Sequence, residues 1–180
     1  MIFRATPLSG AFVVHTERHE DDRGFFARTW CRREFERMGL NTELSQCNVS
    51  YNRRRGTLRG MHWQAHPFAE AKLIRCTRGT IWDVIIDLRD DSPTYTEYFG
   101  VPLSAENARA LYVPEGMAHG FVTLEDDCEV FYQMSQFYEP ASARGVRWND
   151  PAFSIKWPMS DPILHPRDAA YPDFAKPSLV

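Results

Sequence analysis

Two short segments of the chain carry histidines in a setting that could support chemistry. They are Gly56-Thr-Leu-Arg-Gly-Met-His-Trp-Gln64 and Val113-Pro-Glu-Gly-Met-Ala-His-Gly-Phe121. A neutral imidazole can bind a metal ion, and a histidine whose pKa lies near the working pH can act as a general base. His62 and His119 are therefore the first candidates for a functional site.

A metal site is one interpretation of these segments. The spacing P-x-G-x-x-H in the second segment resembles the second cupin motif, and His62, His66, Glu70 and His119 could be offered as ligands. Such a site needs imidazoles and a carboxylate that converge on one ion. The usual first cupin motif is H-x-H, but Gln64 stands where the second histidine belongs, and His66 falls in a predicted loop. The ligand set is incomplete, and we predict no bound metal.

Polar side chains recur on strand faces that are otherwise apolar. In residues 80–88, period-two alternation places Asp83 and Asp87 on one face with two isoleucines. The same alternation in the first histidine segment sets Arg59 opposite His62. An unpaired polar group buried in a purely apolar core costs about 1–3 kcal/mol. The polar residues on these strand faces therefore favour an interior that holds a ligand.

The elements that must position these residues are mostly strands. Turn residues divide the chain into short segments rich in β-branched and aromatic residues. The predicted strands are residues 11–16, 71–76, 80–88, 95–102, 110–113, 120–124 and 128–138. A helix is predicted over residues 29–38 with Gly39 at its C-terminus, a second helical turn after Ser104, and an irregular tail over 158–180. This pattern predicts an all-β, double-sheet jelly roll with one or two short peripheral helices.

Length and composition are those of an ordinary globular domain. The chain has 180 residues, of which 43% are hydrophobic and 25% charged, so we expect one domain over residues 1–180. A net charge of −3 gives no argument for nucleic acid, and Arg53-Arg-Arg55 is too small a patch to change that. No apolar run is long enough to span a membrane. The four cysteines lack a CxxC pair and are predicted to be free thiols, with a cytoplasmic location as the default.

Seven stretches together resemble the dTDP-4-dehydrorhamnose 3,5-epimerase family, in the family's order and at nearly its spacing. They are Asp22-Arg-Gly-Phe-Phe26, Gln46-Cys-Asn-Val-Ser50, Leu58-Arg-Gly-Met-His-Trp-Gln64, Lys72-Leu-Ile-Arg-Cys76, Asp83-Val-Ile-Ile-Asp87, Val113–Phe121 and Val146-Arg-Trp-Asn-Asp-Pro151. The resemblance covers about residues 10 to 170. It implies a cupin-type jelly roll that needs no metal or cofactor, and a homodimer in which strands are exchanged between subunits.

The resemblance also implies a reaction. The family epimerises C3 and C5 of a nucleotide-diphospho-4-keto-6-deoxy sugar in deoxysugar biosynthesis, and dTDP-4-keto-6-deoxyglucose is the expected substrate. Removing the proton next to the C4 ketone gives an enolate, which is then protonated on the opposite face. The family match places His62 as the base, Asp168 as its partner, Tyr132 as the proton donor and Lys72 beside the enolate oxygen. Asp83 is a second candidate for the partner, from its strand face alone.

Other matched positions concern the nucleotide end of the substrate. Arg23, Arg59 and His119 correspond to the diphosphate side, Gln46 and Asn48 to the segment that contacts the base and sugar, and Tyr138 to the aromatic that stacks on the base. Phe26 lies in the same motif as Arg23 and is assigned to the substrate site. Three residues depart from the family pattern, namely Arg28, Gln133 and Ala143.

These departures leave open the nucleobase and the number of inverted centres. They touch none of the residues assigned to the reaction itself. Without the matched neighbours, a lone histidine on a strand is more often structural than catalytic. A metal-dependent cupin oxygenase or isomerase, a carbohydrate-binding jelly roll without activity, and a 3,4-ketoisomerase of the same fold stay open as alternatives.

Overall fold

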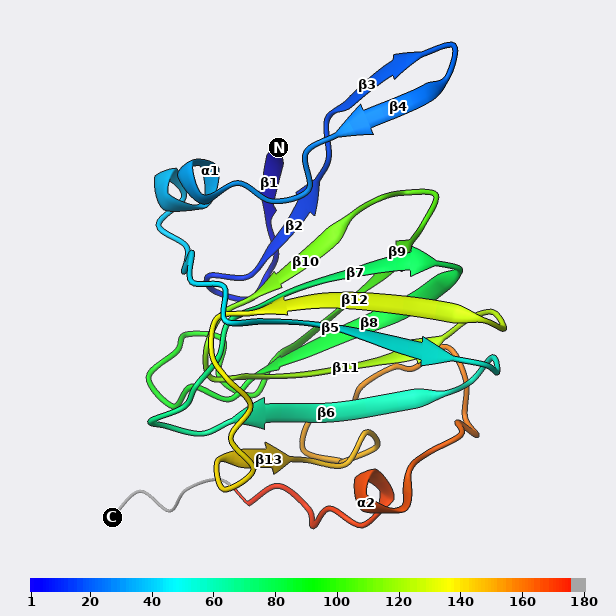
Figure 1. The fold of residues 1–180 in the computed structure, drawn as a ribbon. Coiled ribbons are helices and arrows are strands. Elements are labelled where there is room, and N and C mark those ends of the chain that lie inside the picture. The colour runs from blue at the N-terminus through cyan, green and yellow to red at the C-terminus, as the bar shows by residue number, and fades with distance from the viewer. Residues whose placement is uncertain (176–180) are drawn as a thin grey trace.

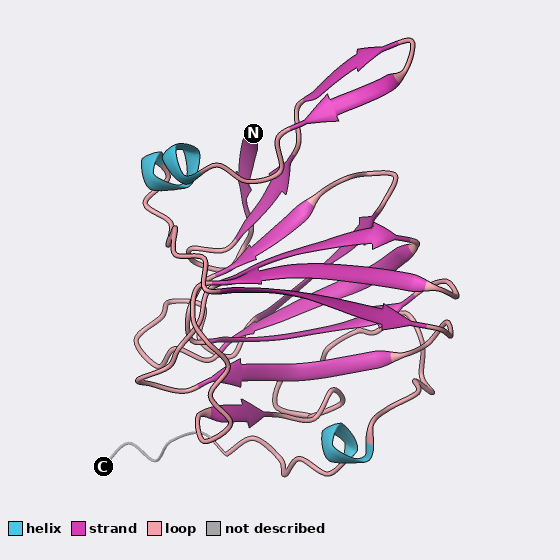
Figure 2. Cartoon of the chain, viewed as in Figure 1, coloured by secondary structure: helices cyan, strands magenta, loops and turns pink. Residues whose placement is uncertain are grey.

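A computed structural model describes residues 1–175 as thirteen strands and two short helices, drawn in Figures 1 and 2. All the strand pairs within its three sheets are antiparallel. The six-stranded sheet has the order β1-β2-β10-β7-β12-β5. Its strands are β1 (Ile2–Ala5), β2 (Phe12–His15), β5 (Gln46–Asn52), β7 (Lys72–Arg78), β10 (Ala110–Val113) and β12 (Cys128–Met134).

The second sheet has five strands in the order β13-β6-β11-β8-β9. Its strands are β6 (Leu58–Gln64), β8 (Thr80–Asp87), β9 (Tyr98–Ser104), β11 (Met117–Thr123) and β13 (Ala143–Gly145). The third sheet is a hairpin of β3 (Arg18–Asp21) and β4 (Gly24–Ala27), which projects away from the rest of the molecule in Figure 1. The predicted jelly roll is therefore present, with a projecting hairpin added to it.

Apolar residues on both faces of the five-stranded sheet explain why its central strands are almost wholly buried. Ile81 and Ile85 of β8 pack into the core between the two large sheets. Val84 and Ile86 point to the other face, where they join a second core that includes Phe153 from the C-terminal segment. Continuous burial of this kind follows when both faces of a strand are covered.

The C-terminal segment is more ordered than the predicted irregular tail. It contains α2 (Pro166–Ala169), and its residue Ile163 forms a parallel bridge to Thr57 just before β6. The ring of His165 caps the helix by accepting the backbone N–H of Arg167 at 3.2 Å. The prediction of an irregular tail was wrong for residues 166–169, which form α2, and residues 176–180 of that tail lie outside the described residues.

The helix predictions were half correct. The predicted helix over 29–38 is present as α1 (Arg32–Arg37), and Gly39 follows it with φ of +68°. The helical turn predicted after Ser104 is only a turn. There, the side chains of Ser104 and Asn107 each accept the other's backbone N–H, at 3.0 and 3.2 Å, and such local bonds compete with helix formation.

Strand β6 contains a β-bulge that overturns the expected alternation. Opposite β11, His62 pairs with His119 and Arg59 pairs with Phe121, so that two residues of β6 oppose the single residue Gly120. Arg59 and His62 consequently both line the cavity described below. The prediction that they lie on opposite faces was wrong, because a bulge shifts side-chain alternation by one residue.

Gly60 makes this bulge sterically feasible. Its φ is +127°, and a Cβ atom at this position would lie 2.5 Å from the Cα of Gly120 on the neighbouring strand. Only glycine fits such a backbone and such a close approach.

The remaining global predictions concern cysteines and membrane spans. The four cysteines are free thiols, as predicted, with Cys76 and Cys128 buried. Within residues 1–175, none of the helices has the length and apolarity needed to cross a membrane.

Candidate active site

A cavity of about 630 Å³ opens between the two large sheets, next to the C-terminal segment. Its walls come from strands of both sheets and from residues around α2. The predicted site residues that line it are Asn48, Arg59, His62, Lys72, His119, Tyr132, Tyr138 and Asp168. Residues that are distant in the sequence are thus gathered on one hollow surface.

His62 and Asp168 form a hydrogen-bonded pair in the cavity wall. The Nε2 atom of His62 lies 2.8 Å from Oδ1 of Asp168, and the two side chains are 31% and 4% exposed. Burial raises the pKa of Asp168, but the hydrogen bond and charge of His62 outweigh it, and the net pKa is lowered. An ionised aspartate holds the proton of the histidine on Nε2, which leaves the lone pair on Nδ1 to accept a proton. This arrangement suits a general base.

A second histidine and aspartate pair lies beside the first. His119 is the cross-strand partner of His62, and its Nε2 lies 2.7 Å from Oδ1 of Asp83. Asp83 is fully buried behind His119 and does not line the cavity itself. Burial raises the pKa of Asp83, while the charge and hydrogen bond of His119 act against that rise. The sequence alternative in which Asp83 partners His62 was wrong, because Asp83 pairs with His119.

The six-stranded sheet supplies the opposite wall. Lys72 and Tyr132 lie on its inner face, where Lys72 pairs with Met134 and Tyr132 with Ile74 across the strands. The Lys72 ammonium contacts a carboxylate oxygen of Glu70 at 2.9 Å. Burial raises the pKa of Tyr132, so the phenol is in its neutral form at neutral pH. A cation and a neutral hydroxyl therefore face the two histidines across the cavity.

Arg59, Asn48 and Tyr138 extend the cavity wall beyond these groups. The guanidinium of Arg59 donates to Asn52 at 2.8 Å. Gln46 does not line the cavity, but its side chain accepts the backbone N–H of Tyr138. Gln46 thereby supports the segment that carries Tyr138.

Arg23 and Phe26 are placed outside the cavity of their own chain. Both lie on the β3–β4 hairpin, where Arg23 pairs with Asp21 and its side chain is 89% exposed. Phe26 is 71% exposed. The structure of one chain therefore does not bring these two predicted substrate residues to the other site residues.

The comparison with known proteins agrees with this geometry. Residues 5–176 match the family model described as dTDP-4-dehydrorhamnose 3,5-epimerase. The chain belongs to this epimerase family.

Individual relatives of the family cover almost the whole chain. It is 43% identical to the dTDP-4-dehydrorhamnose 3,5-epimerase of Shigella flexneri over 164 residues, which is 91% of this chain and 90% of that one. The solved structure of the Bacillus anthracis enzyme with TDP and PPi bound has a TM-score of 0.93 and 40% identity, covering 96% of this chain and 99% of that chain. A dTDP-4-dehydrorhamnose 3-epimerase of Streptomyces niveus is 37% identical over 169 residues, 93% of this chain and 81% of that one. The expected cupin-type fold and epimerase class are confirmed.

Of the three departures from the family pattern, only Ala143 lies at the cavity. Arg28 is exposed, and its guanidinium contacts Glu34 at 3.3 Å near the hairpin. Gln133 precedes Met134 on β12, where alternation turns it to the outer face of the sheet. Arg28 and Gln133 thus do not line the cavity of their own chain.

The alternative of a metal centre does not fit the described residues. Exposed His66 lies outside the cavity that His62 and His119 line, so the offered ligands do not converge on one ion. The amide of Gln64 donates to the carbonyls of two residues at 2.9 and 3.1 Å and accepts a backbone N–H at 2.6 Å. Among residues 1–175, no group of three His, Cys, Asp or Glu could hold a metal ion.

Three residues that line the cavity were not predicted from the sequence to take part in the reaction. Arg167 lies 3.6 Å from Asp168, and the ring of Tyr171 packs edge-on against His62 with centroids 6.0 Å apart. Glu70 was considered only for a metal. The adjacency of Arg167 and Tyr171 to Asp168 in the sequence was the available signal for the first two.

Proposed function

We propose that this protein epimerises a nucleotide-diphospho-4-keto-6-deoxy sugar, with dTDP-4-keto-6-deoxyglucose as the substrate, at C3 and C5 and without a metal. The supporting observation is the His62–Asp168 pair on one wall of a cavity that carries Tyr132 and Lys72 on the opposing sheet. Membership of the epimerase family and the dTDP or TDP ligands of solved relatives support the same conclusion.

His62 starts the proposed reaction. Its Nδ1 takes the hydrogen of C3 or C5 as a proton, and the bonding electrons move into the C4 ketone to form an enolate. The ionised Asp168 stabilises the imidazolium that results. Lys72 places its positive charge beside the enolate oxygen, where the negative charge develops.

Tyr132 completes the reaction from the other sheet. Its hydroxyl proton is delivered to the carbanionic carbon on the face opposite His62, and the C4 ketone reforms. The raised pKa of Tyr132 keeps the phenol protonated until that step. The tyrosine recovers a proton from solvent, and the imidazolium loses its proton to solvent, so the net change is inversion of one centre.

The nucleotide diphosphate is proposed to extend along Arg59, Asn48 and Tyr138. The planar guanidinium of Arg59 suits a phosphate group. Tyr138 is 55% exposed, which leaves its ring free to stack on a base. Gln46 holds the backbone of Tyr138. His119 is proposed to lie on the diphosphate side, as the family match implies.

We propose a homodimer in which the β3–β4 hairpin of each chain reaches the partner subunit's cavity. The hairpin projects from the body in Figure 1, and its Phe25 and Phe26 are 52% and 71% exposed. Arg23 and Phe26 would then meet the nucleotide of the neighbouring site. A test is to coexpress Arg23→Ala and His62→Ala chains. Hybrid dimers regain one intact site, so about a quarter of wild-type activity should return, whereas sites built within one chain would regain none.

The proposed location is the cytoplasm. The four free thiols, two of them buried, are typical of proteins in a reducing compartment. Cell fractionation with an antibody against the chain tests this.

The experiment for the activity is solvent deuterium incorporation. The protein is incubated in deuterated buffer with dTDP-4-keto-6-deoxyglucose, and with its CDP and GDP counterparts, and the sugar is analysed by NMR and mass spectrometry. We expect deuterium at C3 and C5 of the dTDP sugar. Deuterium at C3 alone would identify a 3-epimerase, as in the Streptomyces niveus relative. No exchange with any of the three substrates would reject the proposal.

A further inference from the structure

Glu70 forms a buried ion pair with Lys72 inside the cavity wall. Glu70 Oε1 lies 2.9 Å from Lys72 Nζ, and the two side chains are only 7% and 10% exposed. Both residues line the cavity. Glu70 stands two positions before Lys72, at the entry to β7, so the chain turns both side chains to the same side. A buried pair of this kind is costly unless its geometry is good, which makes it a candidate for a role beyond stability.

Lys72 has more than one acceptor within its reach. Its ammonium also donates to the backbone carbonyl of His62 at 3.4 Å. Burial raises the pKa of Asp83, and the charge of Lys72 is one of the influences that lower it, so Lys72 acts on that carboxylate too. Oδ2 of Asp83 is buried and has no hydrogen-bond partner among residues 1–175. The ammonium thus contacts two acceptors, the carboxylate of Glu70 and the carbonyl of His62, and Glu70 is the charged one.

The charge of Glu70 also reaches Tyr132 on the neighbouring strand. Burial is the largest influence that raises the pKa of this phenol, Arg59 lowers the pKa, and Glu70 raises it further. A diphosphate bound at Arg59 would cancel part of the effect of Arg59. The charge of Glu70 would still act on Tyr132 after the diphosphate has bound, because it is part of the protein.

We propose that Glu70 is a positioning residue of this site, which holds the Lys72 ammonium against the cavity wall and adds to the effect of burial that favours the neutral form of Tyr132. The inference deepens the proposed function and rests on it for the roles of Lys72 and Tyr132. Glutamine at this position would keep the hydrogen-bonding shape of the side chain but lose the charge. The charge is the property that the inference requires, because a neutral amide can accept a hydrogen bond from the ammonium but forms no ion pair with it and does not favour the neutral phenol.

The kinetic test compares Glu70→Gln with the wild type, with Glu36→Gln on the exposed face of α1 as a matched control. We expect kcat to fall about tenfold to a hundredfold with KM little changed, because the Lys72 ammonium is no longer held beside the enolate oxygen. We also expect the alkaline limb of the pH profile to move to lower pH, because the phenol ionises more easily without the charge of Glu70. Glu70→Asp should recover part of both effects, and Glu36→Gln should show neither. An unmoved alkaline limb in Glu70→Gln would overturn the inference.

A second measurement needs no substrate. Tyrosine labelled with ¹³C at Cζ reports the ionisation of Tyr132 by NMR, with Tyr132→Phe to assign its signal. Tyr132 should titrate at lower pH in Glu70→Gln than in the wild type. The double variant Glu70→Gln/Lys72→Gln removes both buried charges, so it keeps the test valid if the single variant folds poorly. An unchanged Tyr132 titration refutes the inference, whereas a shifted titration in a protein that exchanges no deuterium refutes only the proposed function.

Discussion

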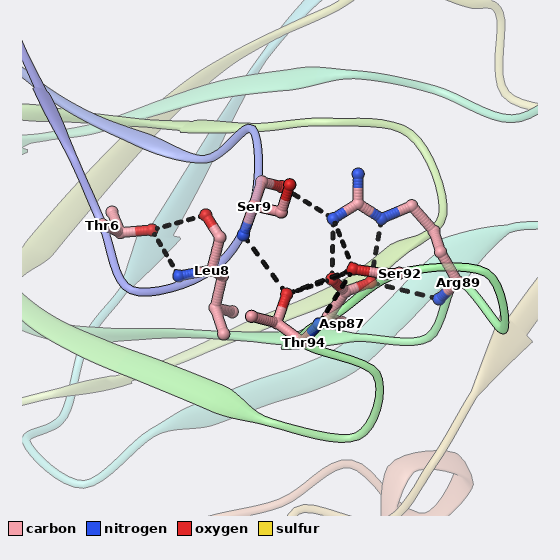
Figure 3. A network of polar contacts seen from close by, with 7 residues as sticks. All are labelled: Thr6, Leu8, Ser9, Asp87, Arg89, Ser92 and Thr94. Carbon is pink, nitrogen blue, oxygen red and sulfur yellow. Dashed lines mark hydrogen bonds and ion pairs between the residues drawn. The ribbon is translucent and has the colours of Figure 1, made fainter.

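Two buried aspartates on strand β8 differ in how completely they are hydrogen-bonded. Asp87 is held by Arg89, Ser92 and Thr94, as Figure 3 shows. Their side chains contact its two oxygens at 2.5 to 2.8 Å. Arg89 and Thr94 also bond to Ser9, which ties the N-terminal turn to this end of the sheet. Asp83 lies four residues earlier on the same face, and among residues 1–175 its side chain is hydrogen-bonded only to His119.

This contrast separates a structural carboxylate from a functional one. Burial raises the pKa of Asp87, but its hydrogen bonds overcome that effect and lower the pKa to about 2. For Asp83 burial prevails and the pKa is raised, with one oxygen left unpartnered among residues 1–175. A buried carboxylate whose two oxygens are both hydrogen-bonded stabilises the fold. A buried carboxylate with one unbonded oxygen is a candidate for a role in a functional site.

The largest effect is expected at a third aspartate, Asp168, which lines the cavity. Asp168→Asn should lower epimerisation about 10³- to 10⁴-fold, because an amide neither selects the required tautomer of His62 nor stabilises its imidazolium. Steady-state kinetics measures this loss. Urea denaturation should show a much smaller change in the free energy of unfolding, and a variant that loses stability but retains activity would remove Asp168 from the mechanism.

Asp87→Asn should give the opposite result. We expect the free energy of unfolding to fall by about 3 kcal/mol, because Arg89 and two hydroxyls lose the carboxylate that they surround. Urea denaturation followed by tryptophan fluorescence checks the loss. The kcat of the folded protein should stay within twofold of the wild type, and a larger fall would show that the two ends of β8 are coupled.

Low pH should reduce the contribution of Asp87 to the free energy of unfolding. Since the pKa of Asp87 is about 2 in the folded protein and 3.8 is its ordinary value, its contribution is full above pH 4 and is lost as pH falls through 2. The difference in stability between the wild type and Asp87→Asn should therefore shrink by about 2 kcal/mol between pH 5 and pH 2. Urea midpoints at several pH values measure it. A difference that is independent of pH would contradict the lowered pKa.

The smallest effect is expected for Asp83→Asn. Removing a charge that is already only partly satisfied should change stability by less than about 1 kcal/mol. Activity should fall about ten- to thirtyfold, because a neutral amide no longer fixes the tautomer and orientation of the His119 ring as the carboxylate does. If Asp83→Asn were instead as unstable as Asp87→Asn, the distinction between the two carboxylates would be lost.

The sequence predicts the strand that carries both aspartates better than it predicts their roles. Alternation in residues 80–88 places Asp83 and Asp87 on one face, because β8 is regular and each face is apolar elsewhere. The same rule fails at Arg59, where a bulge interrupts the alternation. Gly60 is the only local sign of that bulge, and one glycine does not locate it.

Asp168 illustrates a limit of local reasoning. It lies 106 residues from His62 in the sequence and reaches it because the C-terminal segment pairs with the residues before β6. No periodicity in the tail predicts that contact, and only the family resemblance pointed to it. Arg23 and Phe26 are a related case, because a motif match identifies the residues but does not say from which chain they come.

The central claim is that His62 removes the carbon-bound proton and that Tyr132 acts after it. The most direct test follows deuterium entry at C3 and C5 of dTDP-4-keto-6-deoxyglucose in parallel samples of the wild type, His62→Ala and Tyr132→Phe. We predict that His62→Ala abolishes exchange, while Tyr132→Phe still exchanges but returns the deuteron without inversion. Exchange at the wild-type rate by His62→Ala would contradict the account.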